Sequence, residues 1–198
     1  MDAAAAAVAE RLGETTVLVN RPGINKIGPA ELLTDEDWTA VLDVNLTGLY
    51  RCCRAFGGRM LAAARGCIVN VASIIGPQVG MPRPGAVQRK QDGDRRPDAG
   101  HQGRVDGSRR RVNALLPGPV RMPMVETAIA QGIVVEKEVV DRTPAGRWGT
   151  AEDVARTVVL FCGPDAAFVT GQTLVVDSGY TAYGAAHAAT RIPGVANA

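Results

Sequence analysis

Two polar residues and one turn pair lie at the ends of short apolar, strand-like runs of the sequence. They are Asn20, Ser73 and the pair Pro117-Gly118. An amide and a hydroxyl can donate hydrogen bonds to a ligand oxygen whose charge changes during a reaction. In an open parallel sheet, ligands bind at the carboxyl ends of the strands. We therefore expect these residues to line one crevice, although each alone is also typical of a turn.

Strand patterns and helix patterns alternate along the chain, and these elements would position the residues named above. Strand patterns cover Thr16–Asn20, Cys67–Ala72, Val112–Leu116 and Thr173–Val176. Helix patterns cover Ala3–Leu12, a segment starting at the N-cap Thr34, and a segment starting at Ala151. Such alternation predicts an α/β fold with a parallel sheet and right-handed crossovers.

One polar residue, Asn45, interrupts the apolar stripe of the helix that starts at Thr34. The other members of this stripe recur at helical spacing and are Trp38, Val41, Leu42, Leu46, Leu49 and Cys53. Burying an amide costs free energy unless it is hydrogen-bonded. Asn45 is therefore a candidate functional residue.

Chain length and composition limit the classes of protein to which this sequence can belong. A chain of 198 residues with 46% hydrophobic residues suffices for one soluble domain. No apolar run reaches the roughly 18 residues of a membrane span, and the alanine-rich start indicates a helix and not an export signal. We expect a cytoplasmic protein with reduced cysteines and, since His101 and His187 have no ligand-like neighbours, no metal site.

The interval 83–111 does not fit the alternating pattern. It holds nine Lys/Arg and four Asp, with neither helical nor strand periodicity. Residues 83–110 are therefore predicted to be disordered, within a single domain of residues 1–180 that is followed by a flexible tail, 181–198. The alternatives are an Arg-rich surface loop or a loop that binds a partner or polyanion, although the absence of stacking aromatics disfavours nucleic acid.

Six ordered motifs together resemble the short-chain dehydrogenase/reductase family, and within it the 3-oxoacyl-acyl-carrier-protein reductases. They are TVLVN-x-x-G (16–23), DVNLTG (43–48), IVNVAS (68–73), RVNALLPGPV (111–120), GRWGTAEDVA (146–155) and FVTGQTLVVDSG (168–179). The resemblance implies a Rossmann-type doubly wound sheet, of which this chain holds strands corresponding to the family's fourth to seventh.

The resemblance also implies an activity and a site. The activity is NAD(P)-dependent hydride transfer between nicotinamide and a small ketone or secondary alcohol. Ser73 and Asn45 match catalytic positions, and the cofactor-binding positions are Asn20, Gly23, Pro117, Gly118 and Val120. The cofactor is NAD or NADP, the intact parent is a homo-tetramer or dimer, and neither nucleic acid nor a membrane is a partner. The loop from Met124 to Val135 is expected to cover the substrate.

The sequence departs from the family pattern at several points. No TGxxxGxG-type glycine loop is present, and no Tyr-x-x-x-Lys occurs between Ser73 and Pro117. Arg21-Pro22 replaces Asn-Ala, and Met122 stands where the family places a Thr that binds the carboxamide. We therefore expect an N-terminally truncated chain that is marginally stable, exposes an edge strand, and is inactive or strongly impaired.

A frameshift offers one explanation for the anomalous interval. With permitted wobble bases, reading the codons from Ala86 one base later gives R-YSASKTAIAGLTRAIKAEWTAR, which contains Tyr-x-x-x-Lys. The original frame resumes at Arg111-Val112-Asn113. We hypothesise two compensating single-base shifts; the genomic DNA would exclude them if its second frame encodes no such motif.

Overall fold

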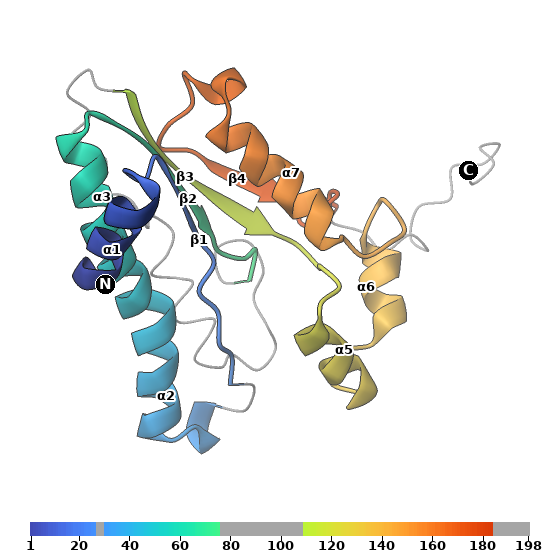
Figure 1. The fold of residues 1–198 in the computed structure, drawn as a ribbon. Coiled ribbons are helices and arrows are strands. Elements are labelled where there is room, and N and C mark those ends of the chain that lie inside the picture. The colour runs from blue at the N-terminus through green and yellow to red at the C-terminus, as the bar shows by residue number, and fades with distance from the viewer. Residues whose placement is uncertain (27–29, 76–108, 184–198) are drawn as a thin grey trace.

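A parallel four-stranded sheet forms the centre of the molecule (Figure 1). The computed structural model describes residues 1–26, 30–75 and 109–183. The strands lie in the order of the sequence, and all neighbours are parallel. They are β1 (Val17–Asn20), β2 (Arg65–Val71), β3 (Arg109–Pro117) and β4 (Thr173–Val176). The predicted α/β fold, part of a Rossmann-type sheet, is confirmed.

Helices cover both faces of this sheet (Figure 1). On one side, α3 packs on β1 and β2, with Leu49 and Met60 against Ile68. On the other side, Phe161 of α7 joins a core with Val69 and Leu115. The helices are α1 (Asp2–Leu12), α2 (Asp35–Leu42), α3 (Gly48–Ala62), α5 (Pro123–Ala130), α6 (Glu136–Arg142) and α7 (Ala151–Cys162), with short turns η1 (Ala30–Leu32) and η4 (Pro164–Ala166).

The helix predicted to start at Thr34 contains a π-helical segment, η2 (Asp43–Thr47), between α2 and α3. Its start is as expected, because the Thr34 hydroxyl accepts a hydrogen bond from the Asp37 amide at 3.1 Å. The predicted apolar stripe is wrong at Leu46, which is 45% exposed. Asn45 and Leu49, which were expected on the same stripe, do face inward, and the wider π turn accounts for the different direction of Leu46.

Two further expectations need correction. Strand β3 begins at Arg109, so Arg109 and Arg110 belong to the sheet, where they pair with Arg65 and Gly66 of β2. The expected loop from Met124 to Val135 is largely helical, because α5 starts with a proline at its first turn, which is a favourable position for helix initiation.

Several expectations fall outside the described residues. These are the disorder and the polyanion binding of residues 83–108, and most of the tail 181–198. None of the helices within the described ranges combines the length and hydrophobicity that crossing a membrane would require. The four cysteines lie in the described ranges, and none of them forms a disulfide there.

Strand β1 forms one edge of the sheet, as predicted. Its side chains differ by face: Leu18 packs toward α3, whereas Val17 and Val19 remain 42% and 45% exposed. Strands of parallel sheets are normally covered on both faces. The edge therefore carries uncovered apolar surface.

Candidate functional site

The carboxyl ends of the four strands lie at one edge of the sheet, because every neighbouring pair is parallel. Asn20 at the end of β1 pairs with Asn70 of β2, and Pro117 at the end of β3 pairs with Val176 of β4. The predicted site residues on strand ends are thus brought to the same edge.

Ser73 is held next to the end of β3. The chain that follows β2 stays attached to that strand, since the Ala72 amide donates to the Leu115 carbonyl at 2.8 Å and the Ile74 amide to the Pro117 carbonyl at 3.1 Å. The Ser73 hydroxyl oxygen accepts a hydrogen bond from the Ile75 amide at 3.1 Å. Its proton is therefore left to donate to another acceptor.

The turn after β3 is fixed by close packing. A Cβ on Gly118 would lie 2.5 Å from the Asp177 Cβ, so only glycine fits there. The Gly118 amide donates to the Val176 carbonyl at 3.0 Å. Val120 is 9% exposed and forms a bridge with Gly149. Pro117, Gly118 and Val120 thus form a rigid wall beside Ser73.

The Asn20 side chain points into the protein. Its amide nitrogen donates to Asn70 Oδ1 at 2.9 Å and to Cys53 Sγ at 3.3 Å, and the residue is only 5% exposed. This amide ties β1 to β2 and to α3. Asn20 can therefore meet a ligand only through its backbone.

Asn45 holds the loop that follows β1. Its Oδ1 accepts from the Ile24 amide and its Nδ2 donates to the Ile24 carbonyl, both at 2.9 Å. The residue is 3% exposed, so these bonds satisfy an otherwise costly buried amide. Among the described residues, no hydrogen bond joins Asn45 to Ser73 directly.

Arg21 and Gly23 begin this same loop. The Arg21 guanidinium Nη2 lies 3.8 Å from the thioether of Met122, in the segment after β3. A Cβ on Gly23 would meet no atom within 4 Å, so open space adjoins the loop. Sequence analysis identified both Arg21 and Met122 only as departures from a pattern, and their contact across the strand ends was not foreseen.

Two buried asparagines were also missed. Asn70 accepts the hydrogen bond from Asn20, and Asn113 on β3 joins two loop backbone groups, the Val169 carbonyl and the Gln172 amide. The available signal was an asparagine within each of three strand patterns. These residues tie the site's framework together.

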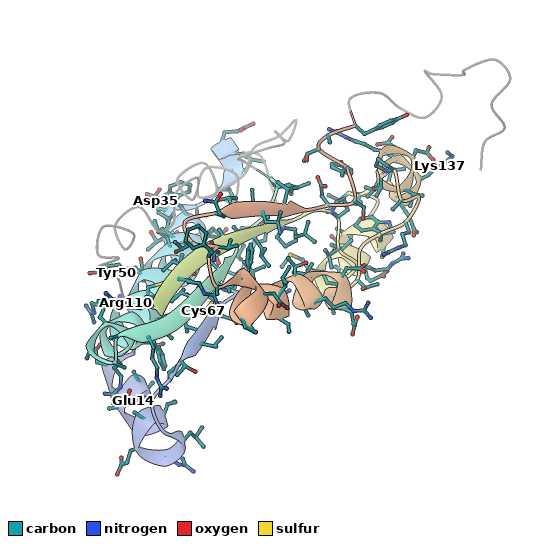
Figure 2. All side chains as sticks on the ribbon, turned by 90° about the horizontal axis from the view of Figure 1, so that it is seen from above. Glu14, Asp35, Tyr50, Cys67, Arg110 and Lys137 are labelled. Atoms are coloured by element: carbon teal, nitrogen blue, oxygen red, sulfur yellow. The ribbon has the colours of Figure 1, made fainter. Side chains whose placement is uncertain are left out.

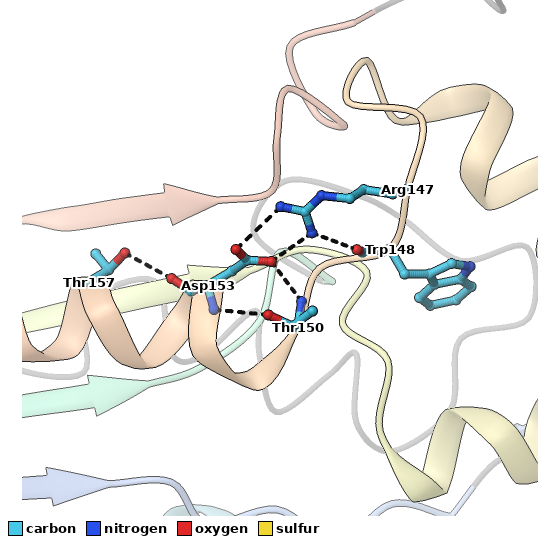
Figure 3. Close-up of polar contacts among 5 residues, drawn as sticks. All are labelled: Arg147, Trp148, Thr150, Asp153 and Thr157. Carbon is cyan, nitrogen blue, oxygen red and sulfur yellow. Dashed lines mark hydrogen bonds and ion pairs between the residues drawn. The ribbon is translucent and has the colours of Figure 1, made fainter.

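The most strongly perturbed carboxyl group belongs to the framework and not to the site (Figure 3). Asp153 lies in the first turn of α7, where Arg147 donates to it at 2.7 Å and the Thr150 amide at 2.8 Å. These bonds, the one from Arg147 first, hold the Asp153 pKa well below its usual value. Thr150 and Asp153 form a reciprocal capping box that starts the helix.

Cys67 is also a framework residue. It lies on β2 beside α7 (Figure 2), where its thiol contacts the Phe161 carbonyl at 3.3 Å. Burial raises the Cys67 pKa to about 11, an effect that nearby Arg111 opposes and Cys162 adds to. The thiol therefore stays protonated and is unsuited to act as a nucleophile.

A small pocket adjoins the wall after β3, but it is not the predicted site. Val120 is the one predicted site residue among those that line it, and neither Ser73 nor Asn45 does. The lining residues are Pro119, Val120, Thr143, Gly149, Asp153, Val154, Val176, Asp177 and Ser178. Within the described ranges, no group of three or more His, Cys, Asp or Glu gathers as metal ligands.

The donors and open space at the strand ends fit the nicotinamide end of a dinucleotide cofactor. The Ser73 hydroxyl proton has no acceptor among the described residues, Gly23 adjoins open space, and the Arg21 guanidinium offers charged donors. These groups could hold polar and anionic parts of a ligand between the loop after β1 and the wall after β3.

Comparison with known proteins matches both halves of the chain. Residues 1–86 match the family described as short chain dehydrogenase, and residues 103–181 match the one described as Enoyl-(Acyl carrier protein) reductase. The interval between these matches, 87–102, lies inside the anomalous segment.

Individual relatives extend over most of the chain. A galactitol 2-dehydrogenase from Rhizobium johnstonii is 35% identical over 92% of this chain and 72% of its own length. A protein of Xanthobacter autotrophicus named inactive 2-(S)-hydroxypropyl-CoM dehydrogenase 2 is 36% identical over 91% of this chain and 80% of its own. The crystal structure of a gluconate 5-dehydrogenase from Burkholderia cenocepacia, in complex with NADP and tartrate, superposes with a TM-score of 0.84 at 27% identity, covering 91% of this chain and 70% of the other.

Proposed function

The chain belongs to the short-chain dehydrogenase/reductase family of NAD(P)-dependent oxidoreductases, and from this premise we propose where its cofactor and substrate bind. The site is the crevice at the carboxyl ends of β1, β2 and β3. The observation that carries this proposal is the hydrogen bond from Ile74 to Pro117, which fixes Ser73 beside the Pro117-Gly118 turn.

Each predicted site residue has a distinct role in this proposal. Ser73 donates its free O–H to the substrate oxygen, which gains negative charge when a ketone is reduced. Asn45 positions the loop after β1 through Ile24. The backbone of Asn20, Gly23 and the turn at Gly118 border the cofactor, which supplies the hydride when bound.

The proposed substrates are small polyhydroxylated alcohols and the corresponding ketones. Relatives and structural neighbours named for galactitol and gluconate support this class. A polyol presents several hydroxyls, and Ser73 offers the crevice a hydroxyl group that can hydrogen-bond to one of them.

We further propose that turnover by this chain is strongly impaired. Hydride transfer to a ketone requires a positioned acid for the new alkoxide. Between Ser73 and Pro117 the sequence contains no tyrosine, so the acid that the family pattern places there is missing. The relative named as inactive, at 36% identity, supports impairment as an outcome within this family.

Binding and turnover can be measured separately. Isothermal titration with NADH and with NADPH tests the crevice, and binding of at least one cofactor is expected. Single-turnover absorbance at equimolar protein, with the ketose derived from galactitol, tests the chemistry and should show no hydride transfer above the rate without protein. Rapid transfer would refute the impairment, and absence of binding to either cofactor would refute the site.

A further inference from the structure

We propose that Arg21 recognises an oxyanion, a carboxylate or a phosphate, on the ligand that enters the crevice. The proposal rests on the proposed function only for the location of the site. It is carried by the position of the Arg21 guanidinium, by the absence of a carboxylate partner for it among residues 1–26, 30–75 and 109–183, and by the way its backbone is held.

The side chain of Arg21 crosses the end of strand β2. Arg21 directly follows β1, and its Nη2 reaches Met122, five residues beyond the end of β3. Because β2 lies between β1 and β3, these two strands are separated by about 10 Å, twice the usual strand spacing. The contact therefore joins the segments that follow the two neighbours of β2, the strand that leads to Ser73, where a reacting ligand would lie.

The guanidinium is exposed and lacks an anionic partner among the described residues. Within the described ranges, its hydrogen-bonding contact is a thioether, which is a weak acceptor. By contrast, some other arginines pair with carboxylates: Arg59 pairs with Glu14, and Arg147 pairs with Asp153. Arg21 thus retains several charged donors in a planar fork, a geometry that matches carboxylate and phosphate oxygens.

The backbone on both sides of Arg21 is held in place. The preceding residue, Asn20, is buried and bonded to Asn70 and Cys53. The following residue, Pro22, restricts Arg21 itself to extended backbone conformations. Directing the side chain across the crevice therefore costs less conformational entropy than it would on a free loop.

Two sources of the oxyanion are compatible with this position: a carboxylate of the substrate and a phosphate of the cofactor. The probes that separate them are tartrate, inorganic phosphate and NADPH, with threitol as the neutral analogue of tartrate on the same carbon skeleton. Arg21→Gln removes the charge and Arg21→Lys keeps it. Arg65→Gln is the matched control, since Arg65 is exposed at the opposite, amino end of β2.

Isothermal titration and ligand-detected NMR measure the binding of each probe, and circular dichroism verifies that each variant is folded. Arg21→Gln should weaken the binding of the recognised anion about tenfold, while Arg21→Lys retains part of it, and Arg65→Gln and threitol binding remain unchanged. Loss confined to tartrate identifies a substrate carboxylate, loss confined to NADPH identifies a cofactor phosphate, and loss of both or of inorganic phosphate supports oxyanion recognition in general.

The proposal is overturned if Arg21→Gln binds tartrate, phosphate and NADPH as wild type does, or if wild type binds none of them at millimolar concentration. Equal weakening by Arg65→Gln would also overturn it, because the effect would then reflect net charge. Binding of tartrate or inorganic phosphate that depends on Arg21, with no binding of NADH or NADPH to the wild type, would leave this inference standing while the proposed cofactor site fails.

Discussion

The α7 side and the β1 side of the sheet are built differently. On the α7 side, the helix begins with a capping box, and the buried Asn113 of β3 is hydrogen-bonded to the loop that leads into β4. On the β1 side, the edge strand exposes Val17 and Val19, and α1 contributes one buried residue, Ala5. The contrast indicates that the α7 side is stabilised from within the chain, whereas the β1 edge presents surface that parallel sheets usually cover.

Among the substitutions that test this contrast, the replacement of Asn113 should lower the free energy of unfolding the most. Asn113 is fully buried, and Asn113→Ala removes its hydrogen bonds to the Val169 carbonyl and the Gln172 amide, so the free energy of unfolding should fall by about 3 kcal/mol. Urea denaturation measures the change. Asn20→Ala on the β1 side is the control, with a loss of about 1.5 kcal/mol; equal losses would contradict the difference between the sides.

The second largest effect on stability is expected from a comparison of two valines that pair in the sheet. Val69 on β2 is fully buried, and its partner Val19 on β1 is 45% exposed. Val69→Ala should cost about 2 kcal/mol and Val19→Ala less than about 0.5 kcal/mol. Thermal and urea unfolding of both variants give the comparison. If Val19→Ala were as destabilising as Val69→Ala, the edge would be covered in solution.

The capping box of α7 should give a smaller effect that depends on pH. Thr150→Ala should cost about 1 kcal/mol, as is typical of a lost N-cap. Since bonds from Arg147 and Thr150 lower the Asp153 pKa in the folded state, its stabilising contribution is present above the ordinary aspartate pKa and is lost as pH falls through the folded-state value.

The unfolding of wild type and of Asp153→Asn is followed at several pH values from about 7 down to about 2, and the comparison measures this dependence. The difference in the free energy of unfolding between the two proteins should be largest near neutral pH and should become smaller in acid. A gap that widens in acid would show that the sign of the linkage is wrong.

The smallest stability effect is expected at Val17. Val17→Lys places a charge on the edge strand at a position that is already 42% exposed, so unfolding should change by less than about 0.5 kcal/mol. Association through strand edges should nevertheless fall, because edge charges oppose pairing. Light scattering as a function of protein concentration measures this association. If the association were unchanged, the molecules would not associate through β1.

Local signals in the sequence predicted much of this fold. The bounds of β4 and the start of α7 were expected where they occur, since a β-branched run and early acidic residues are local features. The α5 and α6 helices were missed, since the segment from Met124 to Val135 was expected to be a loop, although the proline at the first turn of α5 suits a helix start. The π segment, which exposes Leu46, has no such local signal.

The candidate site was predictable only in part. Ser73 and the Pro117-Gly118 turn follow from strand ends, which a parallel sheet gathers at one edge. The inward turn of Asn20 and the bonds of Asn45 to Ile24 depend on contacts between distant residues, 50 and 21 positions apart. The same holds for Arg21 and Met122, 101 positions apart. Sequence spacing alone does not specify such pairs.

Hydrogen–deuterium exchange with and without NADPH tests the location of the cofactor site most directly. With cofactor bound, exchange should slow in the loop after β1, in the segment around Ser73 and in the turn at Gly118, and should stay unchanged in α7. If protection were confined to α7 or α1, with the strand ends unaffected at saturating NADPH, the cofactor would bind elsewhere.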